Sequence, residues 1–308
     1  MPVQQVPTPC GVGDDNSPAT VEWPAASVVI PARDAATTLG EALAALATQD
    51  YPGWWEVLVV AGGSTDATAA LARTYADRLP RLTVLEDALP AGAAAAQNRG
   101  IAASRGDVLV FLDADDVVEP GYLLAMGRAL ATRDFVAGRL DLGRLNAPEA
   151  VRRQRPLQSS GLDVFCGWRP AVVGAAMGAR RTVVEQLGGF DEELTTQQDL
   201  DLSWRLMDAG HDPLFVRDAV VQYRYRATPA SVFRQQRSYG EGEVRLFRKH
   251  HAEGMPRRTV LQVGASYVRL ARAALGLRTP AGRMRCATMA GLLWGRLRGS
   301  ITQRTLYL

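Results

Sequence analysis

Four short apolar runs that alternate with helical segments constrain the fold of this chain more than any other feature. The runs cover residues 27–30, 56–60, 82–85 and 108–112, and they are rich in Val and Leu. Apolar runs of this length without polar alternation are typical of strands that are buried on both faces. Strands that alternate with helices form parallel sheets through crossover connections. The pattern therefore predicts an α/β fold with a parallel sheet that helices cover on both faces.

The unusual residues of the chain directly follow these runs. Pro31, Ala32 and Arg33 follow the first run, a Gly-Gly-Ser-Thr-Asp turn at 62–66 follows the second, and an acidic group at 113–116 follows the fourth. Ligands of open parallel sheets bind at the carboxyl ends of the strands. We therefore expect a single binding site that is built from these three segments.

The acidic group contains three carboxylates, those of Asp113, Asp115 and Asp116. Unpaired carboxylates are costly to bury, so we expect them to lie in an open cleft. Their hard oxygen atoms suit Mg²⁺ or Mn²⁺, which are also the ions that bind diphosphates. The group predicts a divalent metal site, and a strand end that is merely acidic is the alternative.

A second half of the fold is expected over about 120–226. Its small-residue run around Gly174 and Ala175 would let the backbone approach a ligand closely. A helix is predicted to open over 195–202, with Asp199 near its N-terminus. Asp199 is a candidate for catalytic chemistry, and the alternative is an ordinary first-turn acid that stabilises the helix dipole.

Charge is distributed unevenly along the chain. The net charge is +3, but the residues from Arg224 onward carry 17 Arg or Lys against three Glu, a local net charge of +14. Such a region favours an anionic partner, either a phosphate-bearing substrate or a membrane surface. Its basic residues are not interleaved with stacking aromatics, which argues against a dedicated nucleic-acid binder. Beyond about Pro256 we expect amphipathic helices that dock on the preceding domain, and a merely solvated arginine-rich face is the alternative.

The remaining composition is that of an ordinary globular chain. With 308 residues, 47% of them hydrophobic, it can build one large domain or two smaller ones. Residues 1–25 contain five prolines and no apolar run, so we expect a flexible N-terminal arm rather than a signal peptide. Three widely spaced cysteines fit a reducing compartment, the cytoplasm. No 18-residue apolar stretch predicts a membrane-spanning helix.

Seven segments taken together resemble the family 2 glycosyltransferases of the GT-A fold, over about residues 27–249. The matching segments are, in chain order, 28–33, 63–66, 98–100, 111–116, 188–192, 198–205 and 235–240. The resemblance implies a doubly wound, mixed and mostly parallel sheet with a helical C-terminal extension. The implied divisions are the arm at 1–25, a catalytic domain at 26–226 with a nucleotide-binding half (26–119) and an acceptor-binding half (120–226), and a basic helical region at 227–308.

The resemblance also implies an inverting glycosyltransferase that uses a nucleotide-diphosphate sugar together with Mg²⁺ or Mn²⁺. Asp115 and Asp113 would hold the metal, and Asp199 would accept the proton of the acceptor hydroxyl or amine. The implied donor-nucleotide residues are Pro31, Ala32, Arg33, Asp66, Asn98, Asp113, Ala114 and Arg237. The implied acceptor-side residues are Gly174, Ala175 and Trp204.

The chain departs from the family pattern in four places. Ala61-Gly62 stands where the family often has an acidic pair, and Gln97 stands where an Arg is frequent. Gln198 replaces the usual Glu before the catalytic Asp, and Gln222 replaces a His that often joins the metal. These changes keep open a divergent, weakly active homologue that binds a nucleotide sugar or an anionic surface. The sugar, the base and the acceptor also stay open, and the acceptor is either a soluble small molecule or a lipid-linked or polysaccharide chain. The inner face of a membrane and a second copy of the chain are further candidate partners.

Overall fold

The computed structural model describes residues 22–86, 92–151 and 157–307, so most of the predicted arm (residues 1–21) lies outside the described residues. The described residues form a mixed sheet of eight strands in the order β3-β2-β1-β4-β9-β6-β10-β5. Its strands are β1 (Ala26–Pro31), β2 (Trp55–Val60), β3 (Leu82–Leu85), β4 (Val108–Phe111), β5 (Val117–Val118), β6 (Phe135–Asp141), β9 (Met177–Arg180) and β10 (Leu214–Gln222). Strands β1 to β4 are parallel to one another, whereas β9 runs antiparallel to both of its neighbours. The predicted mixed, mostly parallel sheet is therefore confirmed.

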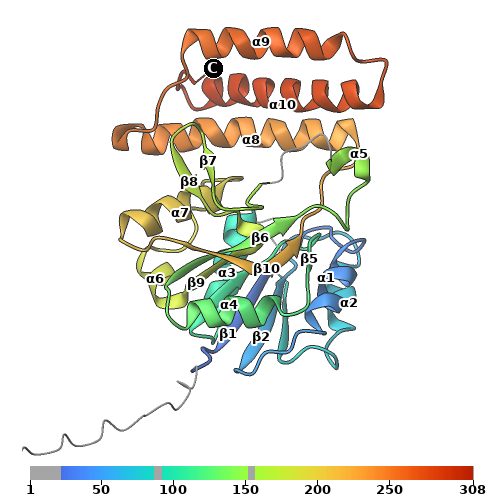
Figure 1. Cartoon of the computed structure of the whole chain (residues 1–308), viewed down its shortest axis with the longest axis vertical. Coiled ribbons are helices and arrows are strands. Elements are labelled where there is room, and N and C mark those ends of the chain that lie inside the picture. The colour runs from blue at the N-terminus through green and yellow to red at the C-terminus, as the bar shows by residue number, and fades with distance from the viewer. Residues whose placement is uncertain (1–21, 87–91, 152–156, 308) are drawn as a thin grey trace, which may run out of the picture.

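Helices cover both faces of this sheet (Figure 1). The helices around the sheet are α1 (Leu39–Leu46), α2 (Thr68–Arg73), α3 (Ala93–Ala103), α4 (Tyr122–Leu130), α5 (Pro148–Val151), α6 (Arg181–Gln186) and α7 (Gln198–Asp208). Side chains alternate along β1, because Val28 and Ile30 join the core beneath α1 and α4, whereas Val29 joins the core on the α3 side. This alternation with a period of two buries the strand on both faces and explains its continuous apolar sequence. The four predicted strands lie within one residue of their expected bounds.

The C-terminal region adds a helical layer beside the sheet, with α9 outermost (Figure 1). Its helices are α8 (Pro229–His250), α9 (Val260–Ala274) and α10 (Pro280–Thr302). A shared core of Trp204 from α7 with Val244 and Phe247 from α8 joins this layer to the domain before it. Helices α8 and α10 pack so closely that a Cβ on Gly295 would lie only 2.0 Å from the carbonyl oxygen of Arg237. The predicted helical C-terminal extension is confirmed.

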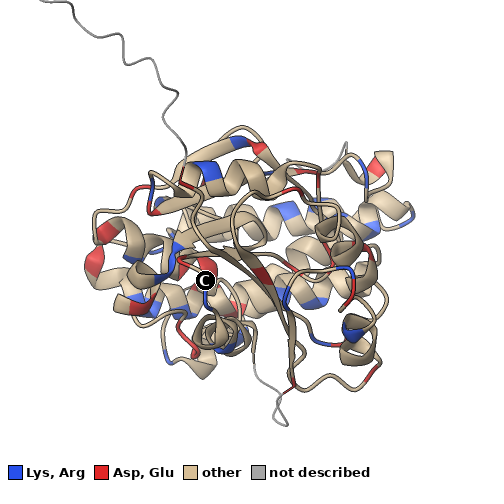
Figure 2. Ribbon diagram, turned by 90° about the horizontal axis from the view of Figure 1, so that it is seen from below, with Lys and Arg blue, Asp and Glu red and all other residues tan. Residues whose placement is uncertain are grey.

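The outer helix α9 exposes apolar side chains among arginines. Val260 and Leu261 in its first turn, and Leu275 directly after its last residue, are each at least 85% exposed. Figure 2 shows the chain from below, with Lys and Arg in blue and Asp and Glu in red, and charges of both signs are spread over the helices and loops. Within the described ranges, no helix combines the length and apolarity that crossing a bilayer requires.

Candidate active site

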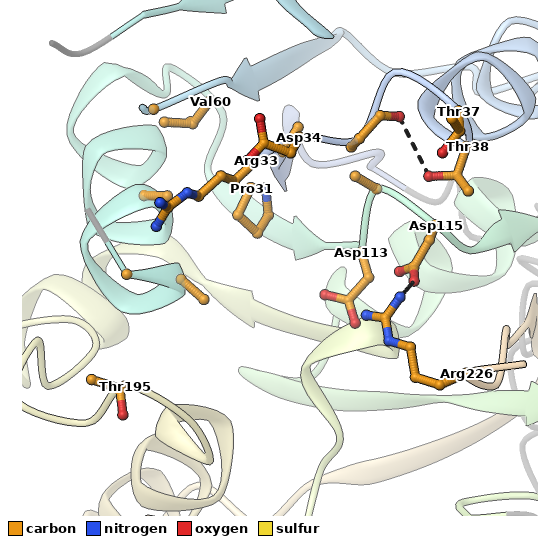
Figure 3. Close-up of a pocket in the computed structure, with 17 residues that line it drawn as sticks. Pro31, Arg33, Asp34, Thr37, Thr38, Val60, Asp113, Asp115, Thr195 and Arg226 are labelled. Carbon is orange, nitrogen blue, oxygen red and sulfur yellow. Dashed lines mark hydrogen bonds and ion pairs between the residues drawn. The ribbon is translucent and has the colours of Figure 1, made fainter. Parts of the chain in front are cut away.

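A pocket of about 500 Å³ opens at the carboxyl ends of β1, β2 and β4 (Figure 3). The sheet order places β1 between β2 and β4, so that the segments following these strands meet at one edge. Six of the predicted site residues line this pocket, namely Pro31, Ala32, Arg33, Asp113, Ala114 and Asp115. We call it the donor pocket below, after the ligand that the sequence predicts for these residues.

The carboxylates of Asp113, Asp115 and Asp116 form an acidic cluster in which the potential ligand oxygens all lie within 4.8 Å of one another. Asp116 is buried, its Oδ1 accepts a 2.8 Å hydrogen bond from the backbone of Arg224, and its Oδ2 has no hydrogen-bond partner among the described residues. Burial, together with the charges of Asp115 and Asp199, raises the pKa of Asp113 to about 7. A set of mutually repelling oxygen ligands fits Mg²⁺ or Mn²⁺, whose charge would offset the repulsion.

Arg226 is a pocket residue that the sequence motifs do not identify. Its Nη1 donates to Asp115 Oδ2 at 2.7 Å, so the guanidinium lies against the acidic cluster (Figure 3). Arg224 supports the same segment, because its Nε donates to the carbonyl oxygen of Asp115 at 2.9 Å. Arg224 and Arg226 alternate along the extended chain that leaves β10. That period of two after a strand is the sequence signal that could have located them.

A second pocket of about 430 Å³ adjoins the donor pocket and contains Asp199. The two pockets share Asp113 and Thr195 among their lining residues. Gly174 and Ala175, which the sequence places on the acceptor side, also line the second pocket. We call it the acceptor pocket, and ligands in the two pockets would meet between Asp113 and Asp199.

The carboxylate of Asp199 is held in place by the backbone. Its Oδ2 accepts a hydrogen bond from the N–H of Gly174 at 2.8 Å, and its Oδ1 accepts one from the N–H of Leu200 at 3.0 Å. The contact depends on a small residue, because a Cβ on Gly174 would lie 3.3 Å from the Cβ of Asp199. Burial raises the pKa of Asp199, and the two backbone donors partly oppose this rise. A carboxylate with a raised pKa is a stronger base, which suits proton transfer near neutral pH.

Asp201, two residues further along α7, has the opposite environment. Its carboxylate is fully buried and lies 2.8 Å from Arg205 Nε, 2.8 Å from Lys249 Nζ and 2.9 Å from His250 Nε2. Burial alone would raise its pKa, but the hydrogen bond from His250 and the charges of Arg205 and Lys249 lower the pKa to about 2. Asp201 therefore joins α7 to α8 and lines neither the donor pocket nor the acceptor pocket.

Trp204 does not contact the acceptor pocket, which corrects its assignment as an acceptor-side residue. Its side chain has no exposed surface, and its Nε1 donates to the carbonyl oxygen of Pro170 at 3.0 Å. The ring packs edge-on against Trp168, with the ring centroids 4.8 Å apart. The apolar face of α7 points into the core here, so the indole stabilises the helix that carries Asp199.

Asp66 and Asn98 hold loops behind the donor pocket. Asp66 accepts hydrogen bonds from the backbone of Ala36 at 3.1 Å and of Thr68 at 3.0 Å. Asn98 exchanges two hydrogen bonds with the backbone of Phe190, each 2.8 Å long. Both side chains are thus occupied by the scaffold, and their contact with a nucleotide stays a prediction.

Arg237 lies on the side of α8 that turns towards α10. Its Nε is 3.7 Å from Glu241 Oε1. Its neighbours Gln236 and Tyr239 line the acceptor pocket instead. The guanidinium that the structure places at the acidic cluster is that of Arg226.

Two of the four departures from the family pattern meet in space. Gln198 Nε2 donates to Gln97 Oε1 at 3.2 Å, so a neutral hydrogen-bonded pair stands where Arg and Glu are usual. Gln222 is buried in the sheet, and its Oε1 accepts a hydrogen bond from the backbone of Arg144 at 3.0 Å. Gly62 lines the donor pocket, where it leaves room for a ligand.

Comparison with known proteins gives matches along most of the chain. The profile of glycosyl transferase family 2 matches residues 27–188, and that of glycosyl transferase family group 2 matches residues 108–297. Glycosyltransferase AglE of Haloferax volcanii is 28% identical over 234 residues, which cover 74% of this chain and 76% of AglE. The pre-mycofactocin glycosyltransferase of Mycobacterium tuberculosis is 29% identical over 242 residues, 75% of this chain but only 49% of that protein.

Two solved structures share the fold. The mannosyltransferase PcManGT from Pyrobaculum calidifontis, in complex with GDP-Man and Mn²⁺, aligns with a TM-score of 0.63 at 20% identity and covers 92% of this chain and 89% of its own. S. aureus TarS 1-349 in complex with UDP-GlcNAc aligns with a TM-score of 0.53 at 17% identity. The alignment covers 92% of this chain and 93% of the TarS chain. The first family profile spans more than half of the chain. Together with the GT-A-type sheet and the acidic cluster at its edge, this match shows that the chain belongs to glycosyl transferase family 2.

Proposed function

We propose that the chain is an inverting glycosyltransferase that moves a sugar from a nucleotide-diphosphate donor to an acceptor hydroxyl or amine, assisted by Mg²⁺ or Mn²⁺. The observation that carries this proposal is the acidic cluster at the junction of the two pockets. Asp113 lines both pockets, Asp115 lines the donor pocket and Asp199 lines the acceptor pocket. This arrangement supports a site in which the donor diphosphate and the acceptor group bind next to each other.

Asp113 and Asp115 would hold the metal ion, with Asp116 behind them. A divalent cation bound there supplies Lewis-acid charge to the donor diphosphate. Arg226, which lies 2.7 Å from Asp115, is placed to donate to the same diphosphate. A guanidinium can make two parallel hydrogen bonds to phosphate oxygens, so Arg226 takes the role that the motif assigns to Arg237. The complex of PcManGT with GDP-Man and Mn²⁺ supports the same type of donor and ion for this chain.

Asp199 acts as the general base of the transfer. It accepts the proton of the acceptor hydroxyl or amine, whose oxygen or nitrogen forms a bond to the anomeric carbon of the sugar. The bond between that carbon and the diphosphate oxygen breaks, and the nucleoside diphosphate leaves with the electron pair. Attack from the side opposite the leaving group inverts the configuration of the anomeric carbon. The raised pKa of Asp199 suits this role, in which a positioned base contributes roughly 10²–10⁴-fold to the rate.

The alternative of a weakly active binding homologue is less consistent with the site. The hydrogen bond between Gln97 and Gln198 means that these two departures satisfy each other instead of leaving one charge unpaired. The carboxylates of Asp113, Asp115 and Asp199 are all present at the pocket walls. These features favour an active enzyme over a nucleotide-binding remnant.

We also propose that the basic C-terminal layer contacts an anionic membrane surface from the cytoplasmic side. After Glu253 the chain contains ten arginines and no acidic residue. The exposed side chains of Val260 and Leu261 on α9, and of Leu275 directly after it, lie among these arginines. Exposed apolar residues combined with Arg are typical of helices that lie in the membrane interface.

A thermal-shift screen of nucleotide sugars in the presence of Mn²⁺ tests the proposed activity. A true donor at 100 times its Kd should stabilise the protein by about 2.7 kcal/mol. The stabilising compound should then release its nucleoside diphosphate when an acceptor is supplied, and the Asp115→Ala variant should show neither effect. A screen in which no nucleotide sugar stabilises the parent protein would count against this function.

A further inference from the structure

The side chain of Arg226 already occupies one of the carboxylates at which a metal ion is proposed to bind. Its Nη1 lies 2.7 Å from Asp115 Oδ2 (Figure 3). The pair lies at the surface of the donor pocket, because 47% of the Arg226 side chain and 20% of the Asp115 side chain are exposed. An ion that approaches Asp115 therefore meets a positive charge that is already in place, and like charges at such a short distance repel each other. The guanidinium and a divalent ion compete for the same carboxylate.

Arg224, two residues earlier, has a different role at the same cluster. Its N–H donates to Asp116 Oδ1 at 2.8 Å, and its Nε donates to the carbonyl oxygen of Asp115 at 2.9 Å. Its Nη2 donates to Glu41 Oε2 at 2.6 Å, so this guanidinium is held by a carboxylate outside the cluster. Of these two arginines, Arg226 is thus the one whose side chain pairs with a cluster carboxylate. One guanidinium against three carboxylates gives only partial compensation, which leaves the cluster open to a divalent ion.

The backbone is anchored on both sides of Arg226. Before it, the N–H of Tyr225 donates to Asn146 Oδ1 at 2.8 Å. After it, Thr228 caps α8, because its Oγ1 accepts a 3.2 Å hydrogen bond from the N–H of Ser231. An exchange of partners by Arg226 therefore requires rotation of its side chain and no movement of the fold. Since this side chain is half-exposed and lines the donor pocket, a ligand in that pocket can become its new partner.

We propose that Arg226 is a tethered cation that occupies Asp115 until the metal ion and the nucleotide bind together, and that it then transfers to the donor diphosphate. The inference rests on the function proposed above and adds the coupling between its two ligands. Without a nucleotide, the guanidinium weakens the binding of a divalent ion by competition and repulsion. A bound diphosphate gives the guanidinium another anionic partner, with which it can form two parallel hydrogen bonds. The ion and the nucleotide then bind cooperatively, and each raises the affinity for the other by the same factor.

Titration of the full chain with Mn²⁺ alone, followed by electron paramagnetic resonance of the free ion, tests the competition. Arg226→Gln removes the charge of a half-exposed side chain. The variant should bind Mn²⁺ about fivefold more tightly than the parent, the factor that corresponds to loss of a partly exposed ion pair. Unchanged or weaker binding of Mn²⁺ by this variant would overturn the proposal, because the guanidinium would then not compete with the ion.

Two further variants separate contact with Asp115 from the general charge of the pocket. Arg226→Lys keeps a cation at the position and should bind Mn²⁺ alone within about twofold of the parent. Arg33→Gln removes another guanidinium of the donor pocket, one that points away from Asp115 (Figure 3). It should also stay within about twofold of the parent, because charges without direct contact are screened by water and salt. A gain in Arg33→Gln as large as that in Arg226→Gln would contradict the proposal, since the net charge of the pocket would then explain both.

Calorimetric titration with GDP and UDP at saturating Mn²⁺ tests the transfer and should give an effect of the opposite sign. Arg226→Gln should bind the nucleotide that the parent prefers about tenfold or more weakly, because it lacks the charged hydrogen bonds to the diphosphate. If this variant binds Mn²⁺ more tightly but keeps the nucleotide affinity of the parent, Arg226 does not transfer to the diphosphate and the proposal is wrong. If the parent itself binds neither nucleotide in the presence of Mn²⁺, the proposed function has failed instead.

Discussion

Two groups of carboxylates, one in the cleft and one at the junction of α7 and α8, have opposite environments. In the cleft, Asp113 lies near two other acids, and its pKa is raised to about 7. At the junction, Asp201 is surrounded by two cations and a histidine, and its pKa is lowered to about 2. Charges that a fold compensates hold its elements together, whereas charges that it leaves uncompensated are available to a ligand. The comparison separates structural from functional acids within a single helix, because Asp199 and Asp201 both belong to α7.

Removal of the junction carboxylate should have the largest effect on stability. Asp201→Ala leaves Arg205, Lys249 and His250 without their shared partner, so the free energy of unfolding should fall by about 3–5 kcal/mol in urea titrations. Asp208→Ala is the control on the same helix, because Asp208 pairs with Arg169 at the surface and its loss should cost at most about 1 kcal/mol. Similar losses in the two variants would mean that the junction is not a structural centre.

Neutralisation of the cleft acid on α7 should affect turnover instead of stability. Asp199→Asn keeps the shape of the side chain but cannot accept a proton, so turnover should fall by about 10²-fold or more. Donor affinity should be nearly unchanged, because the variant leaves Asp113 and Asp115 intact. Steady-state kinetics and nucleotide titrations measure the two quantities. If Asp199→Asn lowers turnover only slightly, whereas Asp201→Asn folds but loses most of its turnover, the wrong carboxylate has been assigned as the base.

Acid should weaken the junction in a defined pH range. The pKa of Asp201 is about 2 in the folded protein and about 3.9 in an unfolded chain, so its ionised form stabilises the fold above about pH 4. That contribution, about 2–3 kcal/mol, is lost as the pH falls from about 4 towards 2. Urea unfolding at pH 5 and pH 2.5 should therefore show a larger acid-induced loss for the parent than for Asp201→Asn. Equal losses in the two proteins would contradict the lowered pKa.

The sheet and the cleft were predictable because their signals are local in sequence. Continuous apolar runs identified the strands, and the polar residues at the ends of these strands identified the edge where ligands bind. The contact between Arg226 and Asp115 could not be predicted in this way, since it joins residues 111 positions apart. The compensation of Asp201 likewise depends on a helix 49 positions later in the chain.

A motif does not fix the phase of a helix, so the surroundings of two predicted site residues could not be read from the sequence. Trp204 lies five residues after Asp199 in the sequence, but α7 directs it into the core. On α8, Gln236 and Tyr239 share the face that lines the acceptor pocket, whereas Arg237 is rotated by about 100° from Gln236. Only the packing of α8 against α10 determines which of these faces points to the pocket.

The smallest expected effect concerns the C-terminal layer. Anionic vesicles should retain the protein at low salt and release it as salt rises, because exposed charges are screened beyond about 8 Å at physiological ionic strength. Leu261→Glu on α9 should weaken this retention by about fivefold, the effect of roughly one unfavourable charge near the surface. Leu214→Glu, an exposed position on β10, is the control and should not change it. Salt-insensitive sedimentation would favour a soluble acceptor and a merely solvated arginine-rich face.

Metal-dependent nucleotide binding at Asp115 is the most direct test of the cleft as the donor site. GDP and UDP are titrated into the parent and into Asp115→Ala, each with Mn²⁺ and with a chelator. The parent should bind one of the two nucleotides at least about tenfold more tightly with Mn²⁺, because the ion offsets the charge of both the cluster and the diphosphate. Asp115→Ala should lose this gain while it unfolds at the same urea concentration as the parent. If Asp115→Ala in chelator binds the nucleotide as tightly as the parent with Mn²⁺, the acidic cluster is not the metal and diphosphate site.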